Sequence, residues 1–104
     1  MKIQQGDVLL NSVSEIPVTA KKVKPAARGY VLAEGEATGH AHTLEALETC
    51  QMFSDGASLF LSIAVPQKVR HEEHKEVELP AGKYRIGIVR EVDPFADEIR
   101  KVQD

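Results

Sequence analysis

Turn-forming residues recur at short intervals along this chain, and strand-like runs lie between them. A Gly-Asp turn signal precedes the apolar run from Val8 to Leu10. Asp55-Gly56 is a strong signal for a two-residue hairpin turn between two apolar runs. The second of these runs, residues 58–65, is apolar enough to form a central strand that is buried on both faces. Short strands joined by close turns predict a mainly β chain.

The C-terminal part of the chain carries a further turn signal and an alternating run. Pro80 and Gly82 suit the turn of a second hairpin. After this turn, the run from Tyr84 to Ile88 alternates between two faces, as a strand does. Asp93 and Pro94 form a helix-start signal, and the alternative for this end of the chain is one more short strand, "IRKV".

Length and composition set the size of the fold. A chain of 104 residues suits one domain, and 42% hydrophobic with 28% charged residues is typical of a folded globular protein. We therefore expect a single β domain over residues 1–104. It should be a compact barrel or sandwich of short, mostly antiparallel strands, with a short C-terminal helix as an open alternative.

Charge and cysteine content narrow the classes of function. The net charge of −3 and the absence of tryptophan argue against a nucleic-acid binder. The basic stretch in 21–29, which we predict to be a solvated loop, is the one candidate for a phosphate contact. No apolar run approaches the roughly 20 residues of a membrane span, so no membrane partner is expected. The single cysteine, Cys50, and the absence of a signal-peptide pattern predict a cytoplasmic protein. Cys50 is expected to be a small buried hydrophobe rather than a nucleophile.

All four histidines of the chain fall in two pairs, His40 with His42 and His71 with His74. We favour a strand for residues 40–47, although "TLEALE" alone would accept a helix. On a strand, His40 and His42 share a face about 6.5–7 Å apart, so their rings can converge on one ion.

The second pair requires a different backbone. His71 and His74 are three residues apart, and on a regular strand they would point to opposite sides. Both can reach one ion only if the chain bends or bulges between them. The spacing is not that of the HExxH metalloprotease motif, since position 75 is Lys.

The clustering of His40, His42, His71 and His74 predicts a site for a divalent metal, with Zn, Ni and Fe as candidates. Carboxylates close in sequence could complete the shell or act as a base. The alternative is a polar rim whose rings are exposed or bonded to the backbone. The local carboxylates are Glu34, Glu36, Glu45, Glu72 and Glu73, of which Glu45, Glu72 and Glu73 are the candidate catalytic residues.

Four segments, "QGDVLL", "GEATGHAHTL", "HEEHKEVELPAGKYRI" and "REVDP", occur in this order and cover most of the chain. Together they resemble a family of small uncharacterised bacterial and phage proteins with the order QGD, GEVTGHxH, HEEH, LPxGxY and REYDP. Ala37 and Val92 depart from the usual Val and Tyr, and neither departure touches a histidine. The resemblance implies a shared histidine site and carries no assigned activity.

A weaker resemblance is to the first motif of the cupins, through Gly35, His40, His42 and Glu45 or Glu48. In cupins such a strand supplies two histidine ligands and a glutamate, and a second motif supplies a later histidine. Here the gap from Gly35 to His40 is one residue short, and no histidine follows the turn at 80–82. A metal-lined β fold of another topology is the equal alternative.

Two classes of function follow from these observations. The first is a small metalloprotein, in which the ion activates water or polarises a substrate for a hydrolytic or related reaction. The second is a non-enzymatic binding or assembly module with a structural or pH-sensitive histidine surface. Whether the protein is an enzyme stays open, and in the second case an edge strand would pair with another copy of the chain or with another protein chain.

Overall fold

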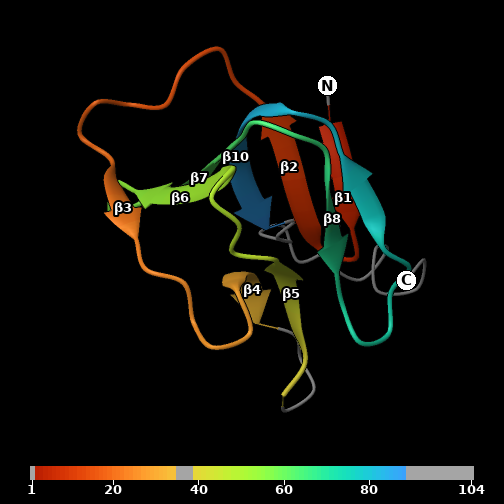
Figure 1. The fold of residues 1–104 in the computed structure, drawn as a ribbon. Helices are drawn as coiled ribbons and strands as arrows, with labels where there is room; N and C mark the ends of the chain where they lie inside the picture. Colours follow the sequence, from red (N-terminus) through yellow and green to blue (C-terminus); the bar gives the residue numbers. More distant parts are fainter. Residues whose placement is uncertain (1, 35–38, 89–104) are drawn as a thin grey trace, which may run out of the picture.

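The computed structural model describes residues 2–34 and 39–88 and is built from antiparallel β-strands (Figure 1). Within these residues there is no helix long and apolar enough to cross a membrane. The predicted helix start at Asp93 and Pro94, and also Gly35 and Glu36, lie outside the described residues. The strands are β1 (Lys2–Gln5), β2 (Val8–Ser12), β3 (Lys21–Val23), β4 (Tyr30–Glu34), β5 (Ala41–Leu44), β6 (Cys50–Ser54), β7 (Leu59–Ile63), β8 (Gln67–Arg70), β9 (Val77–Leu79) and β10 (Gly82–Ile88).

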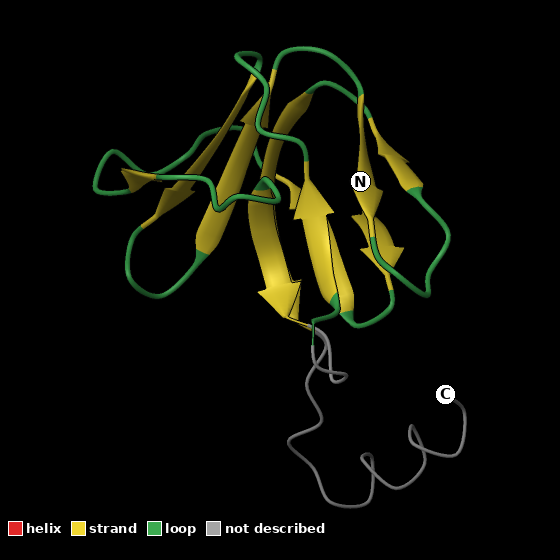
Figure 2. Ribbon diagram, turned by 60° about the horizontal axis from the view of Figure 1, so that its bottom comes forward, coloured by secondary structure: helices red, strands yellow, loops and turns green. Residues whose placement is uncertain are grey.

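The strands form two sheets. One has six strands in the order β1-β2-β10-β7-β6-β3, and the other has four in the order β4-β5-β8-β9. Every pairing is antiparallel. The two layers are visible in Figure 2. Neither sheet closes on itself, so of the two predicted architectures the sandwich describes this fold.

The core lies between the sheets and is built by strand alternation. In β2, Val8 and Leu10 are buried while the residues between and after them are not. In β10, Tyr84 and Ile86 are buried in the same way, which confirms the predicted alternation over this part of the strand, whereas Ile88 at its end is exposed. The four-stranded sheet contributes Leu44, Val69, Leu79 and residues of β4 to the same cluster, and β6 and β7 of the six-stranded sheet also contribute to it.

The predicted central strand and its hairpin are confirmed. The strand β7 lies between β6 and β10, and the consecutive residues Phe60 and Leu61 are both buried, so both faces of the strand are covered. The hairpin turn is longer than the predicted two residues, because residues 55–58 connect the strands. The Asp55 carboxylate accepts hydrogen bonds from the amides of Ala57 and Ser58, and these bonds hold the four-residue turn.

Two local predictions were wrong. The turn at Pro80 and Gly82 does not form a hairpin, because β9 pairs with β8 in one sheet and β10 pairs with β2 and β7 in the other. The turn is therefore a link between the layers, where the hydroxyl of Tyr84 donates to the Pro80 carbonyl at 2.7 Å. Residues 21–23, predicted as loop, pair with β6 and form the edge strand of the six-stranded sheet, because the outer side of β6 offers backbone groups that the polar sequence of 21–23 does not reveal.

We expect Leu61→Ala to lower the free energy of unfolding by about 2–5 kcal/mol, because it leaves a cavity in the fully buried centre of β7. Leu47→Ala is the matched control, since Leu47 is 41% exposed and its truncation should cost less than about 0.5 kcal/mol. Urea denaturation followed by circular dichroism measures both. Equal losses in the two variants would contradict this assignment of the core.

Candidate metal centre

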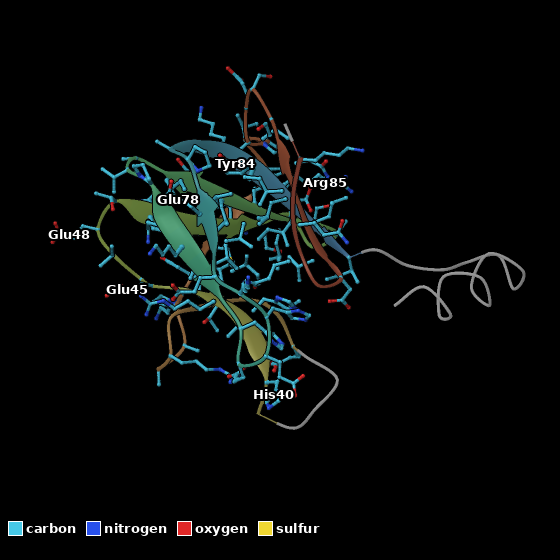
Figure 3. All side chains as sticks on the ribbon, turned by 90° about the vertical axis from the view of Figure 1, so that its right-hand side faces the viewer. His40, Glu45, Glu48, Glu78, Tyr84 and Arg85 are labelled. Atoms are coloured by element: carbon cyan, nitrogen blue, oxygen red, sulfur yellow. The ribbon has the colours of Figure 1, made fainter. Side chains whose placement is uncertain are left out.

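The first histidine pair lies at the start of β5. His42 points toward the space between the sheets and is buried, whereas His40 precedes the strand and is half-buried. Figure 3 shows His40 at the end of the strand. β5 lies between β4 and β8 in the four-stranded sheet. The predicted strand is observed in part: it runs only from Ala41 to Leu44, so it contains His42 and begins directly after His40.

The second pair lies in the loop between β8 and β9. Thr43 pairs with Arg70 and Leu44 pairs with Val69, so one further step in this register places His71 opposite His42. The chain then bends over residues 72–74 before β9 begins, as the sequence required for His74 to approach His71.

The other three imidazole rings each lie next to that of His71. The ring centres of His42 and His71 are 4.4 Å apart, and those of His71 and His74 are 4.6 Å apart. The His42 and His74 rings are stacked at 5.7 Å, and the His40 and His71 rings meet edge to face at 5.8 Å. Two segments about 30 residues apart in the chain thus form one histidine cluster, with His71 in its centre.

The turn between β1 and β2 packs against this cluster. Gln5 pairs with Val8 across a two-residue turn in which Gly6 has a φ of 60°, and this positive φ is the pattern of a type II′ turn. A side chain at Gly6 would place its Cβ 2.7 Å from Nε2 of His74. Gly6 therefore provides both the backbone conformation of the turn and the space that the ring occupies.

The same turn brings a carboxylate to the histidines. Oδ1 of Asp7 lies 3.5 Å from Nε2 of His42. The sequence indicated Asp7 only as a turn residue, and this role was missed because β1 and β5 are far apart in the chain. The order QGD before the histidines was the one available signal.

The Gln5 side chain orients the buried histidine. Its Nε2 donates hydrogen bonds to the carbonyls of Val69 and Lys75, each at 2.9 Å. Both amide protons are used, so its Oε1 faces Nδ1 of His42 at 2.8 Å and must accept a proton from it. This network assigns the proton of neutral His42 to Nδ1 and leaves the lone pair on Nε2, which faces Asp7.

The charge state of His42 follows from its surroundings. Burial lowers the pKa of His42 below its ordinary value, the neighbouring His71 and His74 lower it further, and the Asp7 carboxylate partly opposes them. At neutral pH the ring is therefore uncharged, and its Nε2 lone pair and the Asp7 oxygen are two acceptors facing each other. Two ligand atoms of a tetrahedral zinc ion, each about 2.0–2.1 Å from the metal, lie about 3.4 Å apart, which matches the 3.5 Å observed.

A second group of potential ligands adjoins this pair. One ligand atom each of His40, His71 and Glu72 lie within 4.8 Å of one another. The backbone amide of Ala41 donates to Oε1 of Glu72 at 2.9 Å, and this hydrogen bond is the main reason that the pKa of Glu72 is lowered. Oε1 of Glu73 lies 3.9 Å from Nδ1 of His40.

The cluster is open to solvent on one side. The His42 side chain is only 2% exposed, whereas the side chains of Asp7 and Glu73 are 55% and 70% exposed. A buried ligand on one side and exposed ligands on the other leave room for water or a small molecule at an ion bound between them. The His71 ring is tied to the loop, because its Nδ1 accepts a hydrogen bond from the amide of Glu73 at 3.0 Å.

The structure does not bring Glu45 to the histidines. Glu45 follows the other end of β5, and an extended chain advances about 3.3 Å per residue, which takes it far from His40. Figure 3 shows Glu45 and Glu48 apart from His40. Glu34 instead bonds to Arg28 at 3.2 Å on the surface.

Cys50 is a core residue and not a reactive thiol. It is buried in the core, as the sequence predicted, and burial raises its pKa to about 11. A thiol with this pKa is protonated at neutral pH and is a poor nucleophile.

The fold and the cluster together define a class: a small antiparallel β-sandwich with histidines and carboxylates gathered where a hairpin turn of one sheet meets a loop of the other. The chain belongs to the family described as a domain of unknown function, DUF8820, whose model matches residues 4–89. The matched region includes every histidine and carboxylate of the cluster. No curated protein and no solved structure matches the chain.

We expect NMR of the metal-free protein at pH 7 to find the His42 proton on Nδ1, as the Gln5 amide requires. Gln5→Met should lower the free energy of unfolding by about 2–4 kcal/mol, because buried partners of the amide lose their hydrogen bonds. Gln51→Met, at an exposed position of β6, is the control and should be nearly neutral. A proton on Nε2 in the original protein would contradict the assigned network.

The lowered pKa of His42 predicts a pH-dependent stability of the metal-free protein. An unfolded imidazole titrates near 6.5, so below that value the unfolded chain binds the proton more readily than the folded chain does. The contribution of neutral His42 to the free energy of unfolding is therefore complete above about pH 6.5. It is lost as the pH falls toward the pKa of His42 in the folded protein. Urea denaturation at pH 7.5 and 5.5 should show this loss.

The variant His42→Asn isolates this contribution. Its side-chain amide can still donate to Gln5 but does not titrate, so its stability should change less between pH 7.5 and 5.5 than that of the original protein. A pH dependence of the same size in both proteins would assign the effect to other groups.

Proposed function

We propose that this protein binds a divalent transition-metal ion in the histidine cluster. The observation that carries the proposal is the pair formed by Nε2 of His42 and Oδ1 of Asp7, 3.5 Å apart. Because Gln5 holds the proton of the ring on Nδ1, Nε2 of His42 and the Asp7 oxygen are two neighbouring atoms with free lone pairs. A cation between these atoms removes the repulsion between them.

The kind of ion follows from the donors. Imidazole nitrogen suits Zn, Ni and Fe, whereas Ca and Mg prefer shells made of oxygen alone. The neighbouring rings are those of His71 and His74, whose centres lie 4.4 and 5.7 Å from that of His42, and His71 also belongs to the group of three potential ligands with His40 and Glu72. Gln5 supports the ligand as an outer partner, since a hydrogen bond to the second ring nitrogen sets the orientation of a metal-bound histidine.

The open side of the cluster favours a catalytic use of the ion, in a metal-assisted hydrolytic or related reaction. An ion with a free coordination position lowers the pKa of bound water and makes it a nucleophile near neutral pH. Glu73, exposed and 3.9 Å from His40, is the better candidate base. Glu72 is the better ligand, because its lowered pKa makes it a weaker base.

The alternative is a non-enzymatic module with a pH-sensitive histidine surface. It is favoured by the neighbouring His71 and His74, which add to the effect of burial in lowering the pKa of His42. A change in molecular size between pH 5.5 and 8, in a protein that binds no metal, would select this alternative.

We expect untagged protein, treated with a chelator and then dialysed, to bind Zn²⁺, Ni²⁺ or Fe²⁺ in calorimetric titration and to melt at a higher temperature with the ion. Asp7→Asn should weaken binding by more than about tenfold, because even outer partners of metal ligands change the affinity by roughly 10–100-fold. Glu48→Gln, an acidic surface residue away from the histidines, is the control (Figure 3). If none of the three ions binds, the proposal is wrong.

A further inference from the structure

We propose that the outer face of the six-stranded sheet binds single-stranded nucleic acid, an inference that does not rest on the proposed metal site. In the sequence, the basic stretch 21–29 was the one candidate for a phosphate contact. The structure places part of this stretch in β3, at the edge of the sheet. Lys22 therefore shares a surface with residues that are far from it in the chain.

One row of side chains crosses all six strands on this face. Residues that lie opposite each other in an antiparallel pair point to the same side of the sheet. The strand pairings place the following residues in one such row: Lys22, Phe53, Phe60, Arg85, Asn11 and Lys2. The neighbouring residues Met52, Leu61 and Tyr84 belong to the core cluster, so alternation along the strands puts this row on the outer face.

The charges on the strands of this face have one sign. The two rows beside the first are Gln51, Ser62 and Lys83 on one side, and Gln4, Leu9 and Gly87 on the other. The three rows hold no carboxylate, and their cationic residues are Lys2, Lys22, Lys83 and Arg85. All of these cations are exposed, and none forms an ion pair with a carboxylate of the described residues.

The carboxylates of the chain lie elsewhere. The whole chain has a net charge of −3, so the positive face is balanced by acidic residues on other surfaces. Asp55 follows β6 in the turn, where the amides of Ala57 and Ser58 hold its carboxylate. A surface of one sign attracts a partner of the opposite sign over a distance, which here is a polyanion.

The outer face of the four-stranded sheet provides the contrast. Lys68 and Arg70 of β8 contact the carboxylate of Glu76 at 3.9 and 2.8 Å. Lys68 also lies opposite Glu78 of β9. The cations of that sheet are therefore compensated within the protein, whereas those of the six-stranded face are available to a partner.

An aromatic side chain between the cations favours nucleic acid over an acidic polypeptide. Phe53 lies in the row next to Lys22 and is half-buried, so part of its ring is accessible to a base. Neighbouring strands are about 4.8 Å apart, so Lys22 and Arg85 lie roughly 14 Å apart on either side of the aromatic residues. A base stacked on Phe53 thus has a cation on each side for the phosphates of its strand.

The remaining side chains fit the same ligand. Asn11, Gln51 and Ser62 carry amide and hydroxyl groups that can hydrogen-bond to base edges or sugars. In a duplex the bases are stacked on one another, whereas the bases of a single strand are free to stack on a side chain. The expected ligand is therefore single-stranded DNA or RNA.

The test is the binding of single strands to the full chain in the presence of a chelator, which removes any contribution of metal. Dye-labelled oligothymidine and oligouridine of about 16 nucleotides match the upper site size of a small single-strand-binding domain. Fluorescence anisotropy measures their binding at several salt concentrations. We expect binding at low salt, with a slope of log affinity against log salt of up to about −3, since each phosphate contact contributes roughly −0.7.

Matched variants locate the site. Lys22→Gln and Arg85→Gln should each weaken binding and reduce the magnitude of the slope by about 0.7. Phe53→Leu keeps an apolar side chain but loses the stack with a base, so it should weaken binding roughly tenfold and leave the slope unchanged. Lys68→Gln, on the other sheet, is the control and should bind as the original protein does. Thermal denaturation checks that each variant folds, and the two exposed cations allow the test even if Phe53→Leu does not.

Four outcomes would overturn the inference. The first is no binding of either oligonucleotide at low salt, and the second is binding that Lys68→Gln weakens as much as Arg85→Gln does. Binding of polyglutamate but of neither oligonucleotide would assign the face to an acidic protein. A dimer that Arg85→Gln dissociates would assign it to a second copy of the chain. None of these outcomes bears on metal binding, which the calorimetric titration tests separately.

Discussion

The Gln5 side chain is the contact on which the candidate site depends. It extends from the edge of the six-stranded sheet and donates to two carbonyls of the four-stranded layer, at Val69 and Lys75. Its third bond accepts the Nδ1 proton of His42. Because all three partners are backbone groups or a buried ring, the amide has one satisfied orientation, and that orientation decides which nitrogen of His42 is free. A single polar side chain thus joins the layers and sets the chemistry of the ring.

The turn after Gln5 has a second structural and chemical role. A type II′ turn needs a positive φ at its first residue, and Gly6 meets this need while leaving space for His74. The next residue, Asp7, then projects its carboxylate at His42. In the sequence, Gly6 and Asp7 look like ordinary turn residues of a hairpin. They lie against the histidines because β1 is an edge strand next to the four-stranded layer (Figure 1). The anion and the free nitrogen are therefore held by the same two sheets.

The parts of the site that local rules could predict are those that lie within one segment. The predicted strand was found for His42, with His40 directly before it, and the spacing of His71 and His74 required a bend, which the chain makes over residues 72–74. The turn at Pro80 shows the limit of such rules. Its residues predict a turn but not which strands it joins, and the pairing of β10 with β2 and β7 sends the chain into the other sheet.

The amino-acid sequence by itself determined an antiparallel β chain, a buried central strand and two histidine pairs with the potential to bind metal, since these depend on periodicity and spacing between near neighbours. The tertiary structure alone decided that the two pairs meet, that Asp7 and Gln5 join them and that Glu45 does not. The hydrogen bonds that hold the site join residues that are 31 to 70 positions apart in the chain. Separations of that size are closed by sheet pairing and by packing of the two layers, and neither is encoded in the pattern of any one segment.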